Sequence, residues 1–336
     1  MSKLAIVILN WNGQRYLSQF LPALIQYAPE YSEIIVADNA STDHSVEFLK
    51  TNFPSIKIIK NNENGGFSKG YNDALQQIEA EYYCLLNSDV EVTENWIEPI
   101  INLLDNHSEV AVVQPKLLSF SNKEQFEYAG ACGGFIDFLG YPFCRGRVFE
   151  HLEKDTGQYN HAIEVFWATG AALFVRSKVY HEINGFDEDF FAHMEEIDFC
   201  WRIKNLGYKI MVEPKSVIYH VGGGTLPKKN SLKTYLNFRN NLSLLLKNLP
   251  KNKIFFVFFM RFHLDNMAAI FFLFQGHWKD ALAVIRAQFS FLRQCGKMKR
   301  KRKDIHPHVY SQTFQKSIVF EHFIKKKRIF DGMNLK

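Results

Sequence analysis

Short apolar runs alternate with amphipathic helical segments along the first 114 residues. The run at 4–9 is continuously apolar, which is typical of a strand buried on both faces of a parallel sheet. Residues 15–27 place apolar side chains at helical spacing, and the alternation then repeats. The pattern predicts strands at 4–9, 33–37, 56–59, 82–86 and 110–113, and helices at 15–27, 43–50, 67–78 and 96–104. This order predicts an α/β fold with a doubly wound, mainly parallel sheet flanked by helices.

The pattern becomes less regular after residue 114. Residues 115–160 are rich in glycine and aromatic residues, which predicts loops and short strands over the sheet. Beyond them we expect strands at 164–175, 209–212 and 217–220, helices at 177–184 and 195–205, and a helical pattern from about 232 onward. We therefore predict one α/β unit over residues 1–225, divided near 114, and a helical C-terminal extension over residues 226–336.

The C-terminal extension holds an apolar segment and most of the excess positive charge. Residues 254–275 contain two apolar runs separated by Arg261, His263 and Asp265. A spanning helix needs about 20 largely apolar residues, so we predict a helix in the core in preference to one in a membrane interface. The net charge is +5, and residues 297–336 carry 12 Lys and Arg against three Asp and Glu. This basic tail indicates contact with an anionic surface, or alternatively a solvated charged end.

The cysteine pattern and the first residues indicate a cytoplasmic protein. Five cysteines occur without a Cys-x-x-Cys pair, which disfavours a disulfide framework or a structural zinc site. The first apolar run is short and ends at Asn10, so we interpret it as a strand and not as a signal peptide.

Polar residues follow each of the first four predicted strands, at 10–13, 38–43, 61–66 and 87–91. Ligands of doubly wound sheets bind beyond the carboxyl ends of the strands. One polar strand end is ordinary turn chemistry, but four together favour a polar ligand.

The residue types at these strand ends suit a nucleoside diphosphate. Asp38 can accept a hydrogen bond from the ring N–H of a pyrimidine. The Asn64-Gly65-Gly66 segment allows close approach of the backbone, and a helix beginning near Phe67 would direct N–H groups at the ligand. Asp89 and Glu91 are hard oxygen ligands of the kind that hold Mg²⁺ or Mn²⁺ beside a diphosphate, although an isolated Asp-x-Glu is more typical of a surface turn.

Several of these blocks resemble a known family. VILNWNG, VADNASTDHS, NNENGGFSKGYNDAL and LLNSDVEV resemble the nucleotide-binding half of family 2 glycosyltransferases, in particular the rhamnosyltransferase-like branch. The segment ATGAALFVRSKVYHEINGFDEDFFAHMEEIDFCWRIKNLGYKI and the later VIYHVGGGT resemble the acceptor and catalytic half. The resemblance covers about residues 3–225. It implies a GT-A fold with a Rossmann-like sheet, a nucleotide-binding half at 1–114 and an acceptor and catalytic half at 115–225.

The resemblance also implies ligand-binding roles. Asp38 would bind the base. Asn87-Ser88-Asp89 stands where the family has Asp-x-Asp, so Asp89 would bind a divalent metal, Mn²⁺ or Mg²⁺, and His220 would complete that site. The residues expected to bind the nucleotide are Asn10, Asn12, Asp38, Asn39, Asn64, Gly66, Phe67, Asn72 and Ser88.

The catalytic pair of the family, Glu-Asp, appears here as Glu195-Glu196. Inverting transfer needs one base to take a proton from the acceptor hydroxyl, while a metal neutralises the leaving diphosphate. We expect Glu196 to be that base, with Glu195 as the alternative, although acidic residues also favour helix N-termini. The acceptor-side residues are expected to be Trp167, Thr169, Gly170, Asp198 and Arg202. Core packing is an equal alternative for Trp167, and pairing with Asp198 an alternative for Arg202.

The predicted function is inverting transfer of a hexose-type sugar from a UDP-sugar or dTDP-rhamnose to a hydroxyl of a glycan or lipid-linked acceptor, in cell-envelope polysaccharide synthesis. The basic tail would hold the enzyme on the cytoplasmic face of the inner membrane, and the glycines at 222–224 would form a loop over the donor. The alternative is a catalytically degenerate sugar-nucleotide-binding or scaffold protein on the same fold. A dinucleotide-dependent oxidoreductase would show Gly-x-Gly-x-x-Gly after the first strand, and a nucleotidyltransferase a basic, Gly-rich loop there; neither occurs. No nucleic-acid-binding motif is recognisable, so no nucleic acid partner is expected.

Overall fold

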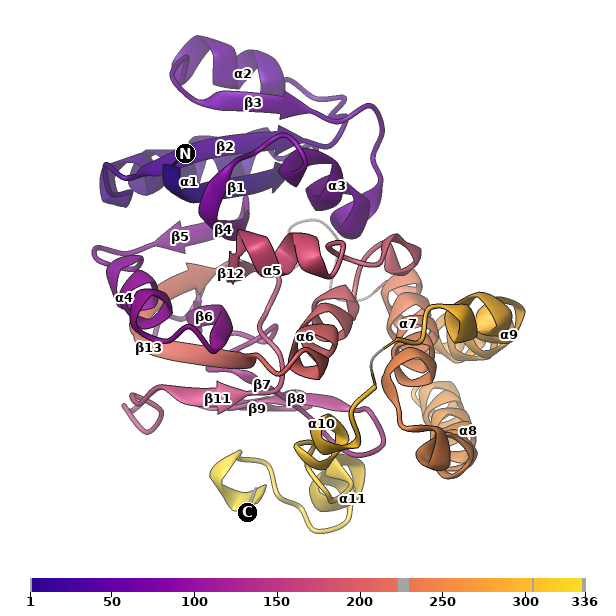
Figure 1. Ribbon diagram of the computed structural model, residues 1–336. Helices are drawn as coiled ribbons and strands as arrows, with labels where there is room; N and C mark the ends of the chain where they lie inside the picture. Colours follow the sequence, from indigo (N-terminus) through magenta and orange to yellow (C-terminus); the bar gives the residue numbers. More distant parts are fainter. Residues whose placement is uncertain (1, 223–229, 304, 334–336) are drawn as a thin grey trace.

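The computed structural model describes residues 2–222, 230–303 and 305–333. Its centre is a nine-stranded sheet in the order β11-β13-β6-β12-β4-β1-β2-β3, with β5 paired to β13 (Figure 1). The strands of this sheet are β1 (Ser2–Asn10), β2 (Ser32–Asp38), β3 (Lys57–Lys60), β4 (Ala80–Asn87), β5 (Val90–Val92), β6 (Val110–Ser119), β11 (Ile163–Val165), β12 (Ala172–Arg176) and β13 (Lys209–His220).

The direction of the strands places most carboxyl ends at one edge. Strands β1 to β4 pair in parallel, and β6 pairs in parallel with β13. The short β12 lies between β4 and β6 and is antiparallel to both, so β4 and β6 run in the same direction. The predicted doubly wound, mainly parallel α/β fold is therefore confirmed.

Helices cover both faces of this sheet because successive residues of a strand face opposite sides. On one face, Leu4, Ile6 and Ile8 of β1 belong to a cluster with α1 (Gln14–Tyr27), α2 (Ser45–Asn52) and α4 (Glu98–Asn106). On the other face, Ala5 and Val7 belong to a cluster with α3 (Gly66–Leu75), α5 (Ser177–Glu182) and α6 (Glu195–Asn205).

The strand predicted at 164–175 is two strands. Strand β11 pairs with β13 at the sheet edge, whereas β12 pairs with β4 and β6 in the centre. The intervening residues cross between these positions, where the Trp167 indole donates to the Phe135 carbonyl at 2.8 Å. A continuous apolar run indicates burial, and here both strands and the crossing between them are buried. Such a run therefore does not show that one unbroken strand is present.

Residues 134–152 form a small antiparallel sheet, and the end of the chain packs against it. Its strands are β7 (Gly134–Ile136), β8 (Pro142–Cys144), β9 (Arg147–Val148) and β10 (His151–Leu152). Phe314 forms a backbone bridge with Asp137, and the Phe330 ring lies 5.0 Å from that of Phe135. Short helices of this terminal segment are α10 (Pro307–Ser311), α11 (Ile318–Phe323) and the 3₁₀ turn η2 (Asp331–Met333).

Three long helices, α7 (Ser231–Asn248), α8 (Lys251–Phe274) and α9 (Trp278–Arg300), stand beside the sheet on the side of α6 (Figure 1). The predicted helical extension is present, but its boundary at 225 and the glycines at 223 and 224 lie outside the described residues. The expectation that 254–275 lies in the core is wrong, because only 22% of the most apolar window of α8 is buried. Apolar composition shows that a helix needs an apolar environment, but not which one.

Several lysines of the basic tail form ion pairs within the protein. Lys301 pairs with Asp187 and Asp189, and Lys297 pairs with Asp189. Lys325 and Lys327 both pair with Glu321. These cations hold parts of the chain together, so the predicted contact of the tail with an anionic surface rests on the remaining ones.

Candidate active site

Asp89 and His220 meet at the carboxyl edge of the sheet. Asp89 lies in the turn between β4 and β5, and His220 is the last residue of β13. The antiparallel pairing of β5 with β13 places Val90 opposite His220. His220 Nε2 consequently lies 3.1 Å from Asp89 Oδ1, and both side chains are buried.

Glu127, which the sequence interpretation missed, completes this cluster. Its Oε1 lies 3.4 Å from His220 Nδ1, so the imidazole stands between two carboxylates. Burial alone would lower the pKa of His220, but the Glu127 and Asp89 carboxylates raise it to about 10. Glu127 lies in the weakly patterned 115–160 region, where no motif marks it and where only the fold brings it to His220.

The cluster fits a divalent metal with further ligands from a substrate. Asp89 offers a carboxylate oxygen, and His220 Nε2 offers an imidazole nitrogen at the same point once a metal displaces its proton. Glu127 would orient the ring through Nδ1, as outer carboxylates do for metal-bound histidines. Within residues 2–222, 230–303 and 305–333, no group of three or more His, Cys, Asp or Glu is arranged to hold an ion by itself. An ion here would take its remaining ligands from diphosphate oxygens and water, as Mg²⁺ commonly does.

The loops after β1 and β2 hold one another in place. Asp38 accepts hydrogen bonds from the Asn10 amide at 3.2 Å and from the Ser41 backbone N–H at 3.1 Å. Asn12 Oδ1 accepts the backbone N–H of Thr42 at 2.7 Å, with Asn12 itself at a positive φ of 52°. The predicted nucleotide residues Asn10, Asn12 and Asp38 therefore lie together at one edge of the sheet, with Asp38 nearly buried.

The third loop connects to the second and to the loop before α6. The Asn39 amide donates to the Asn64 side chain and to the Gly66 carbonyl, each at 3.0 Å. The Phe67 backbone N–H donates to the Phe191 carbonyl at 2.8 Å. Gly66 has a φ of +74°, and a Cβ there would lie 2.5 Å from the same carbonyl, so this contact requires glycine.

Asn72 and Ser88 have different surroundings. Asn72 donates to the Phe186 carbonyl and to Glu188, and it accepts from the Tyr180 hydroxyl and the Phe186 N–H. Its amide is therefore already engaged in fixing α3 to the 180–188 segment, and we expect it to support the nucleotide loops without touching a ligand. Ser88 lies beside the loop after β1, because a Cβ added to Gly13 would lie only 3.3 Å from the Ser88 hydroxyl.

A strained loop leads into the glutamate pair. Phe191, His193 and Met194 all have positive φ, between 63° and 71°, which is unfavourable for residues with a side chain. Asn240 of α7 holds this loop, because its amide donates to the carbonyls of Phe190, Ala192 and His193 at 2.8–2.9 Å. Backbone strain held by surrounding contacts is common at functional sites.

Glu195 and Glu196 begin α6 directly after this loop. Glu195 is buried, Glu196 keeps part of its surface exposed, and each has a buried Oε2 without a hydrogen-bond partner. Burial raises the pKa of Glu196 to about 7. Burial and the neighbouring Glu196 charge raise the pKa of Glu195 well above its ordinary value. Glu196 can therefore gain or lose a proton near neutral pH, while burial favours the neutral form of the adjacent Glu195.

Asp198, three residues further along, belongs to a buried ion-pair network. Its carboxylate accepts from Arg202 and from Lys247, each at 2.8 Å, and from the Asn248 amide at 2.9 Å. Lys247 and Arg202 lower its pKa although burial opposes this. Arg202 also donates to the Ile183 carbonyl. These contacts tie α6 to α7, so the structure offers no support for placing Asp198 and Arg202 against an acceptor.

The other predicted acceptor-side residues lie in the crossing between β11 and β12. Trp167 and Thr169 are buried, and the Thr169 hydroxyl donates to the Ala129 carbonyl at 2.5 Å. A Cβ on Gly170 would lie 2.9 Å from the Phe67 ring. This segment therefore packs against Phe67 at the start of α3, and of the three residues only Gly170 retains a partly exposed position.

The sheet edge, the candidate metal ligands and the glutamate pair are compatible with a transferase that acts on a nucleoside-diphosphate sugar. Residues 5–177, just over half of the chain, match the model of glycosyl transferase family 2, and the chain belongs to this family. It is 21% identical over 233 residues to the N-acetylglucosaminyl-diphospho-decaprenol L-rhamnosyltransferase of Mycobacterium tuberculosis, covering 65% of this chain and 75% of that protein.

Solved structures show the same GT-A fold. The structure of S. aureus TarS 1-349 in complex with UDP superposes with a TM-score of 0.52 at 16% identity, over 92% of this chain and 90% of that one. The structure of GalNAc-T7 with UDP, GalNAc and Mn²⁺ has a TM-score of 0.57 at 15% identity, over 75% of this chain and about half, 49%, of that one. The predicted fold and family are confirmed, and the protein is a glycosyltransferase.

Proposed function

We propose that the protein moves a sugar from a UDP-sugar or dTDP-rhamnose to a hydroxyl of a glycan or lipid-linked acceptor in cell-envelope synthesis, with inversion at the anomeric carbon. The observation that carries the proposal is the Glu195–Glu196 pair, in which each carboxyl has a buried Oε2 without a hydrogen-bond partner, at the end of a loop bonded directly to the start of α3. The name of the mycobacterial relative, a rhamnosyltransferase acting on a diphospho-decaprenol, supports the lipid-linked acceptor.

Asp89 and His220 would hold a divalent metal against the donor diphosphate, with Glu127 fixing the ring of His220. Such an ion neutralises the charge that develops on the leaving diphosphate. Asp38 would select the base, and the backbone at Gly66 would approach the phosphates or ribose closely because it carries no side chain.

Glu196 would accept the proton of the acceptor hydroxyl as its oxygen attacks the anomeric carbon. The new C–O bond forms while the bond to the diphosphate breaks, so a single displacement inverts the configuration. Glu195, whose pKa burial raises, would favour its neutral form, which would keep a second negative charge away from Glu196 and leave Glu196 as the base.

Binding of a nucleotide panel tests the proposal. UDP, dTDP, GDP, ADP and NAD would each be added to the full chain with and without Mn²⁺, and the shift in melting temperature measured. Stabilisation by UDP or dTDP that depends on Mn²⁺ is the expected result. Metal-independent binding of NAD would contradict it, and failure of every nucleotide to bind would favour the alternative of a degenerate scaffold.

A further inference from the structure

Helix α8 turns charged residues toward the protein and apolar residues outward, which is the reverse of a helix on the surface of a water-soluble protein. The residues that it turns toward the protein are Val257, Arg261, Asp265 and Ala269, at a spacing of four. The residues that it turns outward are mostly large and apolar. Six of its phenylalanines, Phe255, Phe256, Phe259, Phe262, Phe271 and Phe274, are at least half exposed.

The inward polar residues fix α8 to the rest of the molecule. Arg261 and Asp265 are buried and pair with each other, with Arg261 Nε 3.1 Å from Asp265 Oδ1. Arg261 also donates to the Leu139 carbonyl, and Asp265 accepts from the Tyr141 hydroxyl at 2.9 Å. By length and composition α8 could cross a bilayer, but a helix whose middle is bonded to the catalytic unit in this way cannot be surrounded by lipid.

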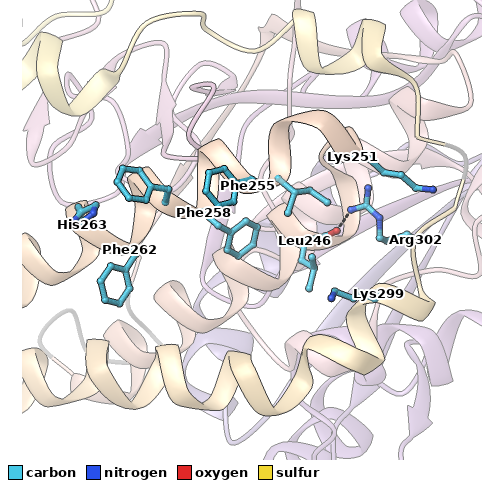
Figure 2. A pocket seen from close by; sticks show the side chains of 10 residues that line it. Leu246, Lys251, Phe255, Phe258, Phe262, His263, Lys299 and Arg302 are labelled. Carbon is cyan, nitrogen blue, oxygen red and sulfur yellow. Dashed lines mark hydrogen bonds between the residues drawn. The ribbon is translucent and has the colours of Figure 1, made fainter.

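A groove of about 990 Å³ runs along the outward face between α8 and the end of α9 (Figure 2). Leu246, Phe255, Phe258, Phe259 and Phe262 give it apolar walls. At one end it is lined by three cations, Lys251, Lys299 and Arg302, whereas Phe262 and His263 lie at the other (Figure 2).

These cations are suited to an anionic partner. The Arg302 guanidinium is held by the carbonyls of Leu246 and Leu249. Lys251 and Lys299 form no ion pair with any of the described residues. An apolar aromatic face bordered by lysine and arginine is the composition of helices that lie in a membrane interface, with the aromatic side among the acyl chains and the cations at the headgroups.

We propose that the outward face of α8, together with Lys251 and Lys299, docks the protein on the surface of an anionic lipid bilayer, with α8 lying in the plane of the membrane. The helix is about 36 Å long at 1.5 Å per residue, so it would rest on the bilayer along most of its length. A bilayer with anionic headgroups accounts both for the exposed phenylalanines and for the lysines that border them, because acyl chains and headgroups lie side by side at its surface. The proposal is independent of the donor and of the acceptor.

Co-sedimentation of the full chain with vesicles tests the proposal. The vesicles would contain phosphatidylglycerol and phosphatidylcholine, or phosphatidylcholine alone. Phe255→Ser/Phe259→Ser changes two stacked, exposed rings of the same face, and we expect it to weaken binding to the anionic vesicles at least tenfold. Lys251→Gln/Lys299→Gln should weaken it by roughly fivefold per charge, because each basic residue near such a surface contributes about 1 kcal/mol.

The matched control is Ile25→Ser/Tyr31→Ser, which changes two exposed apolar side chains outside the C-terminal extension. It should bind vesicles as the unchanged chain does, and circular dichroism should show that all three variants are folded. Equal binding by the control and the phenylalanine variant would overturn the proposal. So would a stable dimer, measured without lipid by light scattering, that Phe255→Ser/Phe259→Ser converts to monomers. Neither readout depends on nucleotide binding, so failure of the proposed function would be seen separately.

Discussion

Glu195 and Glu196 are adjacent carboxylates with different chemistry, because the fold gives them different surroundings. Both begin α6, but Glu195 is buried and also experiences the charge of Glu196. A group that acts as a base near neutral pH needs a pKa close to that pH, and burial raises the pKa of Glu196 to about 7. The sequence located the pair and not the difference between its members, since that difference comes from packing.

We therefore expect Glu196→Gln to lower kcat by about 10²–10⁴-fold while donor binding is kept. Glu195→Gln is the matched control, because Gln resembles a protonated carboxyl and should cost much less. In the unchanged enzyme, kcat/KM should fall as the pH drops below about 7, since Glu196 is then protonated and cannot accept a proton. Initial rates between pH 5.5 and 8.5 test both statements. A larger loss in the Glu195 variant would transfer the role of base to Glu195.

Glu127 is a residue of the candidate metal site that no sequence motif marks. Asp89 was predicted from its place after a strand and from the family resemblance, and His220 from the resemblance alone. Glu127 becomes informative only once its carboxylate is seen 3.4 Å from His220 Nδ1. Its position suits it to orient the ring of His220, which we propose as a metal ligand.

If so, Glu127→Gln should weaken Mn²⁺ affinity by about 10–100-fold without abolishing binding. Asp89→Ala should remove the metal dependence of nucleotide binding altogether. Titration of Mn²⁺ at fixed UDP or dTDP, followed by the melting temperature, measures both effects. An unchanged Mn²⁺ midpoint in Glu127→Gln would assign that residue a purely structural role.

At the scale of elements, α7 holds in place the strained loop at 190–194 that precedes the glutamate pair. Asn240 holds the strained 190–193 carbonyls, and Lys247 joins Asp187 before the loop to Asp198 after it, at 2.6 and 2.8 Å. The sequence predicted that α6 and α7 were helices. It could not predict the buried ion pair between Lys247 and Asp198, because a charged residue in a sequence does not reveal a partner 49 residues away.

Replacing Lys247 should therefore strongly lower the free energy of unfolding. Lys247→Met leaves two buried carboxylates without their shared cation, and breaking a buried pair costs about 3–5 kcal/mol of the free energy of unfolding. Lys297→Met removes an exposed partner of Asp189 and should cost less than about 1 kcal/mol. Urea unfolding of the two variants gives the comparison. Similar losses in both would show that the buried network is not what fastens α6 to α7.

At the scale of the whole molecule, the strands of the first half were predictable because continuous apolar runs and polar strand ends repeat with the period of the fold. The position of residues 230–303 and 305–333 was not predictable, because helical periodicity does not say what a helix covers. Residues 231–300 hold the catalytic loop on one side and expose α8 on the other, while 305–333 return to cover the small sheet. The extension is thus bound to the catalytic unit at two separate places.

This arrangement predicts that the chain unfolds as one cooperative unit. Phe314 exchanges backbone hydrogen bonds with Ile136 and Phe138, and its buried ring lies 5.6 Å from that of Phe143. Phe314→Ala should cost about 3–5 kcal/mol, as for other buried phenylalanines, and should shift a single transition seen by both near- and far-ultraviolet circular dichroism. Phe320→Ala, at a half-exposed ring of the same segment, should cost far less. Two separate transitions, with only one displaced by Phe314→Ala, would instead make the extension an independent domain, because only a shared core couples the unfolding of both parts.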